Sequence, residues 1–305
     1  MITLIENFRA VFYAPFYAAV ELGAYEQEGV ALVVKLSADA ASRDRFVVSG
    51  EGEVSWGGPL RLMHTLERDP QAGVVAFCEV VQRDPFLLVG REPNRSFRLE
   101  QLAGARLATV SEVPTPWLCL RHDLRLAGIP EDRIQRITGA TMADNAAALR
   151  AGRVDVIQVF EPFAAALQAE GAGHVWYASS DRGPTSYTTF NTTRAFLERQ
   201  PDTALRMCRA MFRTQKWIAA HDGKDLARVI APYFPGMDDA VLAAALEGYR
   251  ARNVWNATPL PGQAGFEWLR DAAMAGGMLK TRFSYDDCVN VRFARQAIVD
   301  DPPSL

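Results

Sequence analysis

Apolar positions follow two different periods through the first 180 residues of the chain. Residues 2–5, 30–36 and 154–159 are continuous or alternating apolar runs, which are typical of strands. Residues 15–22 and 142–151 repeat apolar side chains at three- and four-residue spacing, which is typical of helices. Strand and helix follow one another along the chain, and this order predicts an α/β fold with parallel strands joined by crossover helices.

The remaining elements follow from the same patterns. Strands are expected at residues 53–56, 74–77, 85–89, 175–178 and 187–192, and helices at 40–49, 59–67, 116–127 and 162–170. Residues 99–110 read as a short helix, a turn and a strand. From residue 193 onward the pattern is mainly helical, and 204–220 is an amphipathic stretch that would cover the first lobe.

The strand–helix pattern is interrupted once and then restarts. The acidic and polar segment 79–84 is the first candidate crossing between two lobes, and residues 187–192 are the candidate return. We therefore predict lobe I from residues 1–83 and 190–305, and lobe II from residues 84–189. No repeat or low-complexity linker is visible, so two crossover strands should join the lobes, with a cleft between them.

Composition narrows the class of partner. The chain has 305 residues, a formal net charge of -3 and a pI near 5.9, so nucleic acid and anionic membranes are poor partners and a small molecule is favoured. No apolar run is long enough to span a membrane. The first residues carry no signal-peptide pattern, so we expect a cytoplasmic monomer, or a periplasmic one if a leader has been removed.

Cysteine and histidine offer no metal or disulfide pattern. Neither residue type shows paired spacing, so we expect no metal, no disulfide and no cofactor; the residues are Cys78, Cys119, Cys208, Cys288, His64, His122, His174 and His221. The cysteines should be small buried hydrophobes. Motifs for hydrolase or nucleotide chemistry are also missing from the sequence.

Several segments resemble one family when taken together in order. They are Asn7-Phe8 with Ala14-Pro15-Phe16-Tyr17, then 23–30, 50–58, 102–108 and 149–156. In this order they resemble the start, middle and second half of NMT1/THI5-like periplasmic binding proteins, the sulfonate, nitrate and thiamine-precursor type. The resemblance implies a type II periplasmic-binding-protein fold, a ligand held between the lobes and an ABC permease as partner.

The first lobe supplies one set of candidate ligand residues. The turn after the first strand resembles the family's first ligand loop, and its candidates are Asn7, Phe8, Phe12 and Tyr13. Trp56 could stack on a planar ligand, and Gly57 and Gly58 would let that ligand approach the backbone at a helix start; core packing and turn formation are the alternatives.

The crossings and the second lobe supply the rest. Two prolines stiffen the loop 111–117, where the family receives polar ligand groups, and its candidates are Ser111, Glu112, Thr115 and Trp117. Glu161 either reaches the cleft or partners a helix dipole. Glu79 and Asp84 lie in the first crossing, where hinge hydrogen bonding is the other role; Tyr187 lies in the return.

These candidates lead to a ligand hypothesis. Carboxylates at Glu79, Glu112 and Glu161 would favour an amino-substituted heteroaromatic, such as an aminopyrimidine thiamine precursor, over a sulfonate or nitrate. An arginine turned into the cleft would reverse this preference and favour the anion.

An enzymatic alternative stays open at this stage. Met63-His64-Thr65-Leu66 looks like a segment of THI5-like synthases that make the thiamine pyrimidine from pyridoxal phosphate and their own histidine. Those enzymes hold the cofactor through a lysine shortly before that histidine, and this chain has Pro59, Leu60 and Arg61 there, so no Schiff base can form. Their cysteine-rich segment is absent as well. We therefore expect a binder and no catalysis.

Overall fold

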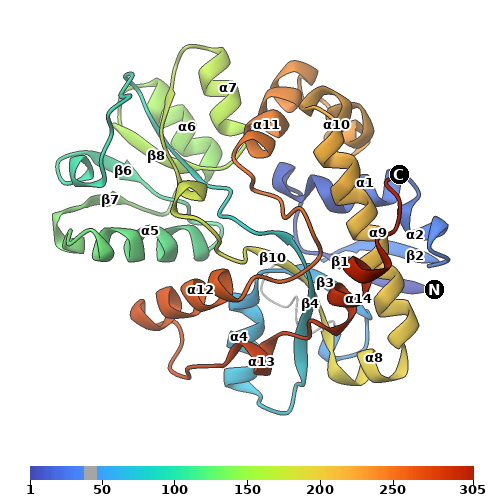
Figure 1. The fold of residues 1–305 in the computed structure, drawn as a ribbon. Coiled ribbons are helices and arrows are strands. Elements are labelled where there is room, and N and C mark those ends of the chain that lie inside the picture. The colour runs from blue at the N-terminus through green and yellow to red at the C-terminus, as the bar shows by residue number, and fades with distance from the viewer. Residues whose placement is uncertain (38–46) are drawn as a thin grey trace.

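Each of two lobes is built on its own mixed sheet in the computed structural model, which describes residues 1–37 and 47–305. The lobes lie side by side in Figure 1. The first five-stranded sheet has the order β2 (Leu32–Leu36), β1 (Ile2–Glu6), β3 (Val54–Gly57), β10 (Thr188–Thr193) and β4 (Val74–Val81). The second has the order β7 (Gln135–Ile137), β6 (Arg106–Ala108), β8 (Val156–Val159), β5 (Leu87–Gly90) and β9 (His174–Ala178).

Strand direction agrees with the sequence prediction in the core of each sheet and differs at the crossings. β1 pairs in parallel with β2 and β3, and β6 pairs in parallel with β7 and β8. β10 is antiparallel to β3 and β4, and β5 is antiparallel to β8 and β9. The prediction of parallel strands was wrong for β5 and β10, because each enters its sheet directly from the other lobe and needs no crossover helix.

Helices cover both sheets as the apolar spacing predicted. In the first lobe these are α1 (Ala14–Glu21), α2 (Ala24–Gln27), α4 (Pro59–Arg68), α8 (Arg194–Arg199) and α9 (Pro201–Ala220). In the second lobe they are α5 (Thr115–Leu126), α6 (Met142–Arg150) and α7 (Phe163–Ala169). Short 3-10 helices occur at Val11–Tyr13, Leu99–Leu102, Glu131–Arg133, Ser179–Arg182 and Ala231–Tyr233. Most of the helix predicted at residues 40–49 lies outside the described residues.

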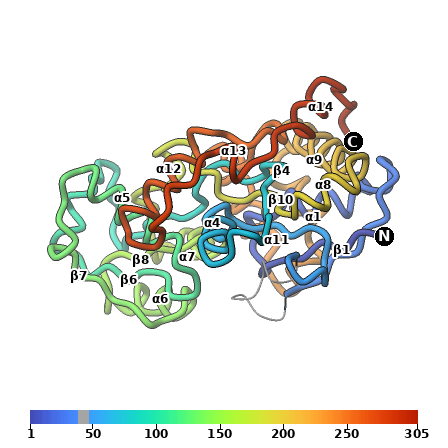
Figure 2. Tube along the Cα trace, turned by 90° about the horizontal axis from the view of Figure 1, so that it is seen from below, coloured from blue at the N-terminus to red at the C-terminus, as the bar shows by residue number. Residues whose placement is uncertain are grey.

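The C-terminal helices contact both lobes. They are α10 (Gly223–Ile230), α11 (Asp239–Ala251), α12 (Gln263–Ala275), α13 (Tyr285–Cys288) and α14 (Arg292–Asp300). α14 packs on α9 of the first lobe, but α11 packs against α7 and α12 packs against both α5 and α4. Figures 1 and 2 show α12 running beside α5 of the second lobe. The tail therefore bridges the lobes, where the sequence had suggested that it covers the first lobe.

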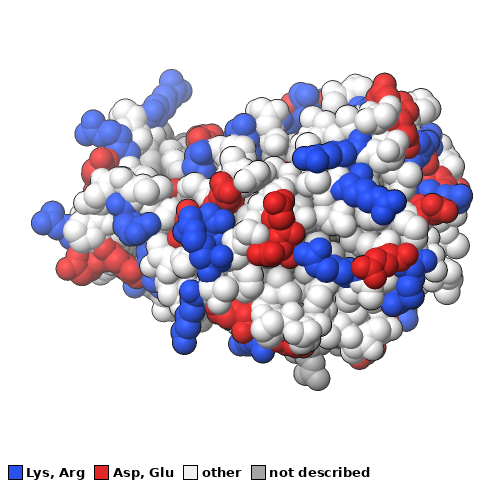
Figure 3. Space-filling view, turned by 60° about the horizontal axis from the view of Figure 1, so that its bottom comes forward, with Lys and Arg blue, Asp and Glu red and all other residues white. Residues whose placement is uncertain are grey.

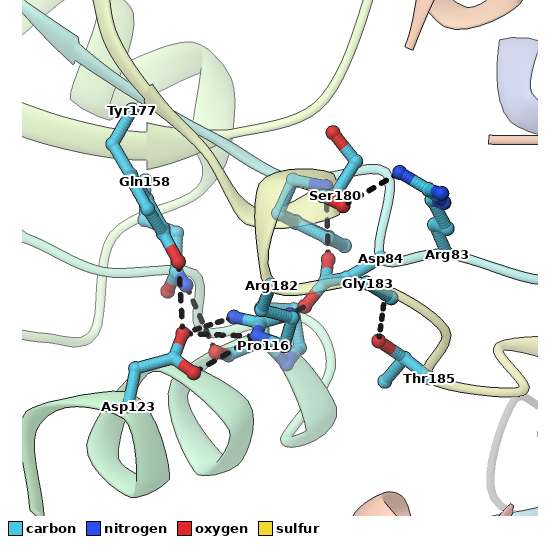
Figure 4. A network of polar contacts seen from close by, with 11 residues as sticks. Arg83, Asp84, Pro116, Asp123, Gln158, Tyr177, Ser180, Arg182, Gly183 and Thr185 are labelled. Atoms are coloured by element: carbon cyan, nitrogen blue, oxygen red, sulfur yellow. Dashed lines mark hydrogen bonds and ion pairs between the residues drawn. The ribbon is translucent and has the colours of Figure 1, made fainter. Parts of the chain in front are cut away.

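A buried ion network ties the two crossing segments to the second lobe (Figure 4). The side chain of Arg182 is 5% exposed; its Nη1 donates to Asp84 2.7 Å away, and its Nε donates to both Asp123 oxygens at 2.9 and 3.0 Å. Asp84 also accepts from the backbone N–H of Phe86 at 2.9 Å, and Tyr177 donates to Asp123 at 3.3 Å. Asp84 is thus fully engaged in hydrogen bonds within the first crossing, and its role at a hinge stays a prediction.

The four cysteines lie in the interior of the protein. Cys78, Cys119, Cys208 and Cys288 are free thiols, and all four are buried, the environment that the sequence predicted for them. Among residues 1–37 and 47–305, no helix is long and apolar enough to cross a membrane.

Candidate functional site

A cavity of about 530 Å³ lies between the lobes and is the candidate ligand site. Both lobes, both crossing regions and the C-terminal tail contribute side chains to its wall. The lining residues are Asn7, Phe8, Phe12, Tyr13, Gly58, Leu60, Arg61, His64, Arg68, Phe86, Glu112, Val113, Pro114, Thr115, Tyr187, Leu269 and Met278.

The turn after β1 brings an amide to the cavity. Asn7 is 5% exposed, and its Oδ1 has no hydrogen-bond partner among the described residues. A Cβ at Gly57 would lie 2.8 Å from the Asn7 Nδ2, so glycine at that position makes room for the amide. A buried amide oxygen without a partner is costly, and a ligand donor in the cavity would satisfy it.

Aromatic rings form the wall next to Asn7. The ring centroids of Phe12 and Tyr13 are 4.3 Å apart, and Phe8 lies 5.3 Å from Tyr13 and 6.0 Å from Phe12. Phe12 also meets Tyr187 of the return crossing edge-on, at 6.0 Å. These rings hold one another in place, so they offer a rigid apolar surface to a ligand at little entropic cost.

Two arginines and a histidine come from one face of α4. Arg61, His64 and Arg68 stand at positions i, i+3 and i+7 of the helix, and this spacing places all three on the side that lines the cavity. Arg68 is exposed and makes no hydrogen bond or ion pair with a described residue. Leu62, Met63 and Leu66 on the opposite side are buried and anchor the helix.

The β3–α4 turn approaches the return crossing closely. A Cβ at Gly58 would lie 2.9 Å from the backbone oxygen of Tyr187, so a side chain there would push the crossing strand away. Pro59 then begins α4 at a position where its missing N–H leaves no hydrogen bond unmade.

The second-lobe wall is the loop before α5. Glu112, Val113, Pro114 and Thr115 line the cavity. The Glu112 carboxylate accepts from the backbone N–H of Met142 at 2.7 Å and from that of Ser111 at 3.2 Å. Because Met142 begins α6, this carboxylate is already neutralised in part by a helix amino terminus.

The C-terminal tail completes the wall. Leu269 and Met278 are the tail residues in the cavity lining. Trp268, next to Leu269 on α12, stacks over the Arg182 guanidinium at 4.8 Å and meets the His122 ring at 5.1 Å. The tail is therefore held against the same ion network that ties the crossings to the second lobe.

The structure brings eight of the predicted site residues together in this cavity. They are Asn7, Phe8, Phe12, Tyr13, Gly58, Glu112, Thr115 and Tyr187. The other six do not line it: Trp56, Gly57, Glu79, Ser111, Trp117 and Glu161.

Trp56 lies in the core of the first lobe, contrary to the proposed stacking role. It is 0% exposed, and its ring stacks on Phe16 with centroids 4.5 Å apart. Side chains alternate across a strand, and at this position of β3 the indole points under α1. It supports the cavity indirectly, since its ring lies 5.8 Å from that of Tyr13.

The predicted acids other than Glu112 are engaged elsewhere. Glu79 is 2% exposed, and its Oε2 accepts from the Asn256 side chain at 2.7 Å. Burial raises the pKa of Glu79 to about 7, against hydrogen bonds from Ser186, Asn256 and Gly262.

Glu161 lies at the seam between α7 and α11. Its Oε2 accepts from the N–H of Ala165 at 2.7 Å, and its own backbone N–H donates to the Tyr249 hydroxyl at 2.8 Å. Burial raises the pKa of Glu161 to about 7, although the Ala165 N–H and Arg252 lower it. This is the helix-partner role that the sequence had left as an alternative.

Ser111 and Trp117 line a neighbouring groove instead of the cavity. The Ser111 Oγ accepts from the N–H of Gly139 at 2.8 Å, and the guanidinium of Arg136 covers the Trp117 ring at 4.1 Å. The Trp117 side chain turns away because Thr115 is the first residue of α5, and the helix rotates its successors off the cleft. Ser111 precedes the helix, and its hydroxyl is held by the hydrogen bond to Gly139.

Sequence reasoning missed the other nine lining residues as cavity contacts. Arg61 and His64 had been noted only for the synthase alternative. The i, i+3, i+7 spacing of Arg61, His64 and Arg68 was a usable signal. Phe86, Leu269 and Met278 carried no local signal, because only the packing of the crossings and the tail brings them to the cleft.

A family model described as NMT1/THI5 like matches residues 11–224. The Bacillus subtilis protein YtlA, whose name describes a binding protein, is 25% identical over 297 residues, covering 97% of this chain and 89% of YtlA.

Solved structures share the fold. The periplasmic sulfonate-binding protein SsuA of Methylobacillus flagellatus has a TM-score of 0.77 at 15% identity, over 98% of this chain and 94% of SsuA. The periplasmic nitrate-binding protein NrtA of Synechocystis has a TM-score of 0.73 at 13% identity, over 98% and 88%. The desulfurization enzyme DSZB has a TM-score of 0.69 at 14% identity, over 99% and 100%. The predicted periplasmic-binding-protein fold is confirmed by this likeness.

Proposed function

The chain belongs to the NMT1/THI5-like family, and from that premise we propose that it is a solute-binding protein that closes its lobes around a small organic anion with an aromatic or apolar body. One observation carries the ligand class. The cavity combines an aromatic wall with the face of α4 that carries the cations Arg61 and Arg68 beside His64. A ring would pack on the aromatic wall, and its sulfonate, sulfinate or carboxylate group would meet the guanidinium groups.

This ligand class replaces the aminopyrimidine suggested by the sequence. That suggestion depended on three carboxylates facing the cleft, and two of them, Glu79 and Glu161, do not line the cavity. The third, Glu112, is hydrogen-bonded to the start of α6. The condition stated for reversing the preference, an arginine turned into the cleft, is met by Arg61 and Arg68.

The synthase alternative gains nothing from the cavity. His64 lines it, but its neighbours on the same helix face are Arg61 and Arg68, and neither guanidinium can form a Schiff base with pyridoxal phosphate. The likeness to YtlA, SsuA and NrtA favours capture without catalysis.

Closure would use the two crossings as the hinge. We expect the ligand to settle first on the Asn7 and α4 side, and the 112–115 loop to close over it. By likeness to SsuA and NrtA, the protein would then work in the periplasm and deliver its ligand to an ABC permease.

Matched ligand pairs test the ligand class. Thermal unfolding would be followed with benzenesulfonate and benzoate, with the neutral analogue benzamide, and with 4-amino-5-hydroxymethyl-2-methylpyrimidine. Anionic members should raise the free energy of unfolding by about 2.7 kcal/mol at a concentration of 100 Kd, and the neutral analogue should not. Stabilisation by the aminopyrimidine alone would contradict the proposed anionic ligand and favour a heteroaromatic base instead.

A further inference from the structure

A second groove of about 630 Å³ lies beside the cavity, on the other side of the loop that forms the second-lobe wall. Val113, Pro114 and Met278 line both the cavity and the groove. Since the same three side chains form a wall of each, the two spaces adjoin at Pro114 and Met278. A ligand that reached from the cavity to the groove would have to cross these residues.

The groove has an aromatic floor with a fixed cation on it. The Arg136 guanidinium lies 4.1 Å from the centre of the Trp117 ring, and its Nε donates to the Thr109 hydroxyl at 2.9 Å. The two terminal nitrogens of Arg136 make no hydrogen bond to a described residue. One edge of the guanidinium is therefore held by the protein, and the other edge is available to an anion.

Positive charge exceeds negative charge in the groove lining. Arg121 and Arg136 are opposed by one carboxylate, Glu131, whose Oε2 lies 3.7 Å from the Arg121 Nη1. Burial and the neighbouring Arg121 both lower the pKa of Arg136, while Glu131 raises it. Acidic and basic side chains are interspersed over the face drawn in Figure 3, and no broad surface of one sign is seen on that face.

The opposite wall of the groove is rigid. Arg121 donates from Nη2 to the Gly276 oxygen at 2.6 Å. A Cβ at Gly276 would lie 2.2 Å from that nitrogen and 2.3 Å from Leu118, so the tail packs against α5 without space for a side chain. The wall next to Met278 is thus preorganised by contacts that do not involve a ligand.

We propose that this groove is a second subsite, which takes the far anionic end of an elongated aromatic ligand whose first anionic group lies against α4. The inference rests on the proposed function and adds a length and charge preference to it. Rigid aromatic dianions should bind more tightly than the monoanions that end inside the cavity. Pro114 and Met278 contact the middle of such a ligand.

Calorimetric titration with two probes tests the subsite. Benzenesulfonate reaches only the cavity, whereas biphenyl-4,4′-disulfonate carries a second sulfonate at its far end. At 150 mM salt we expect the disulfonate to bind the wild-type protein about tenfold more tightly, the effect of one charge-assisted contact. In Arg136→Met, which keeps the stem over Trp117 and removes the charge, this ratio should fall to about one.

Arg133→Met is the matched control, because Arg133 is exposed on the same lobe and lines neither space. A ratio near ten in this variant, together with its loss in Arg136→Met, supports the subsite. An equal loss in both variants means that the summed positive charge of the second lobe causes the tighter binding of the disulfonate, and the subsite proposal is then wrong. A wild-type ratio near one overturns the subsite and leaves the anion-binding function standing. Failure of both probes to bind overturns both proposals.

Discussion

Arginine occupies two contrasting places in this protein, the crossings that we propose as the hinge and the wall of the cavity. At the hinge, Arg182 is 5% exposed and hydrogen-bonds to Asp84 and Asp123. At the cavity, Arg68 makes no ion pair with a described residue, and it stands on the same helix face as Arg61 and His64. The ion-paired Arg182 stabilises the fold, whereas Arg68, which has no ion-pair partner among the described residues, can bind an anionic ligand.

The difference follows from the energetics of burying charge. Moving a guanidinium out of water costs several kcal/mol, which the hinge offsets with two carboxylates and their own hydrogen bonds to Phe86 and Tyr177. Burial raises the pKa of Asp84, while Arg182 lowers it. Arg68 keeps its hydration at the mouth of the cavity and needs no such partner. Four predictions test this contrast.

The largest effect is expected from breaking the paired site. Arg182→Met leaves two carboxylates buried side by side without a cation, so it should lower the free energy of unfolding by about 3 to 5 kcal/mol. Urea denaturation measures this loss. Adding Asp84→Asn and Asp123→Asn to the same chain should restore part of the stability, because no buried carboxylate is then left without a cation. If Arg182→Met alone were as stable as the wild type, the ion network would not stabilise the crossings.

A buried carboxylate without an arginine partner should make stability depend on pH. Glu79 has a pKa of about 7 in the folded protein and an ordinary value of 4.5, so its proton stabilises the fold fully below pH 4.5. That contribution, about 3 kcal/mol, is lost as pH rises to 7. Denaturation at pH 5 and pH 8 should show the loss in the wild type and a smaller loss in Glu79→Gln. Equal pH dependence of the two proteins would contradict the raised pKa.

The unpaired cation should affect binding and leave folding unchanged. Arg68→Met should weaken binding of the anionic ligand about tenfold, while the free energy of unfolding stays within about 0.5 kcal/mol of wild type. Titration calorimetry and urea denaturation measure the two quantities. Arg95→Met removes an exposed charge in the second lobe and serves as the control. A large loss of stability in Arg68→Met would contradict the contrast, because it would mean that Arg68 stabilises the fold as Arg182 does.

The smallest effect is expected where an ion pair is exposed. Arg150 donates to Glu170 at 2.6 and 2.9 Å, but the two side chains are 40% and 48% exposed. Water solvates both charges whether or not they meet, so Arg150→Met should show no measurable change in urea denaturation. A loss comparable to that of Arg182→Met would mean that contact distance, and not burial, sets the strength of these pairs.

Local chain signals located about half of the candidate site. Asn7, Phe8, Phe12 and Tyr13 follow β1 directly, so identifying the strand was enough to place their turn at the cleft. Trp56 shows the limit of this reasoning. It also stands at a strand end, but one residue decides whether a side chain points to the cleft or to the core, and strand boundaries read from sequence are not that accurate.

Alternating apolar periods by themselves determined the two α/β lobes and the order of most elements, because these features depend on residues that are neighbours along the chain. Tertiary structure alone decided that β5 and β10 run antiparallel, that the tail bridges the lobes, and that Phe86, Leu269 and Met278 meet α4 at one cavity. Tertiary structure also decided that Arg182 is ion-paired and that Arg68 makes no ion pair with a described residue. Such features depend on contacts between residues that are far apart along the chain, and no local pattern of side chains records them.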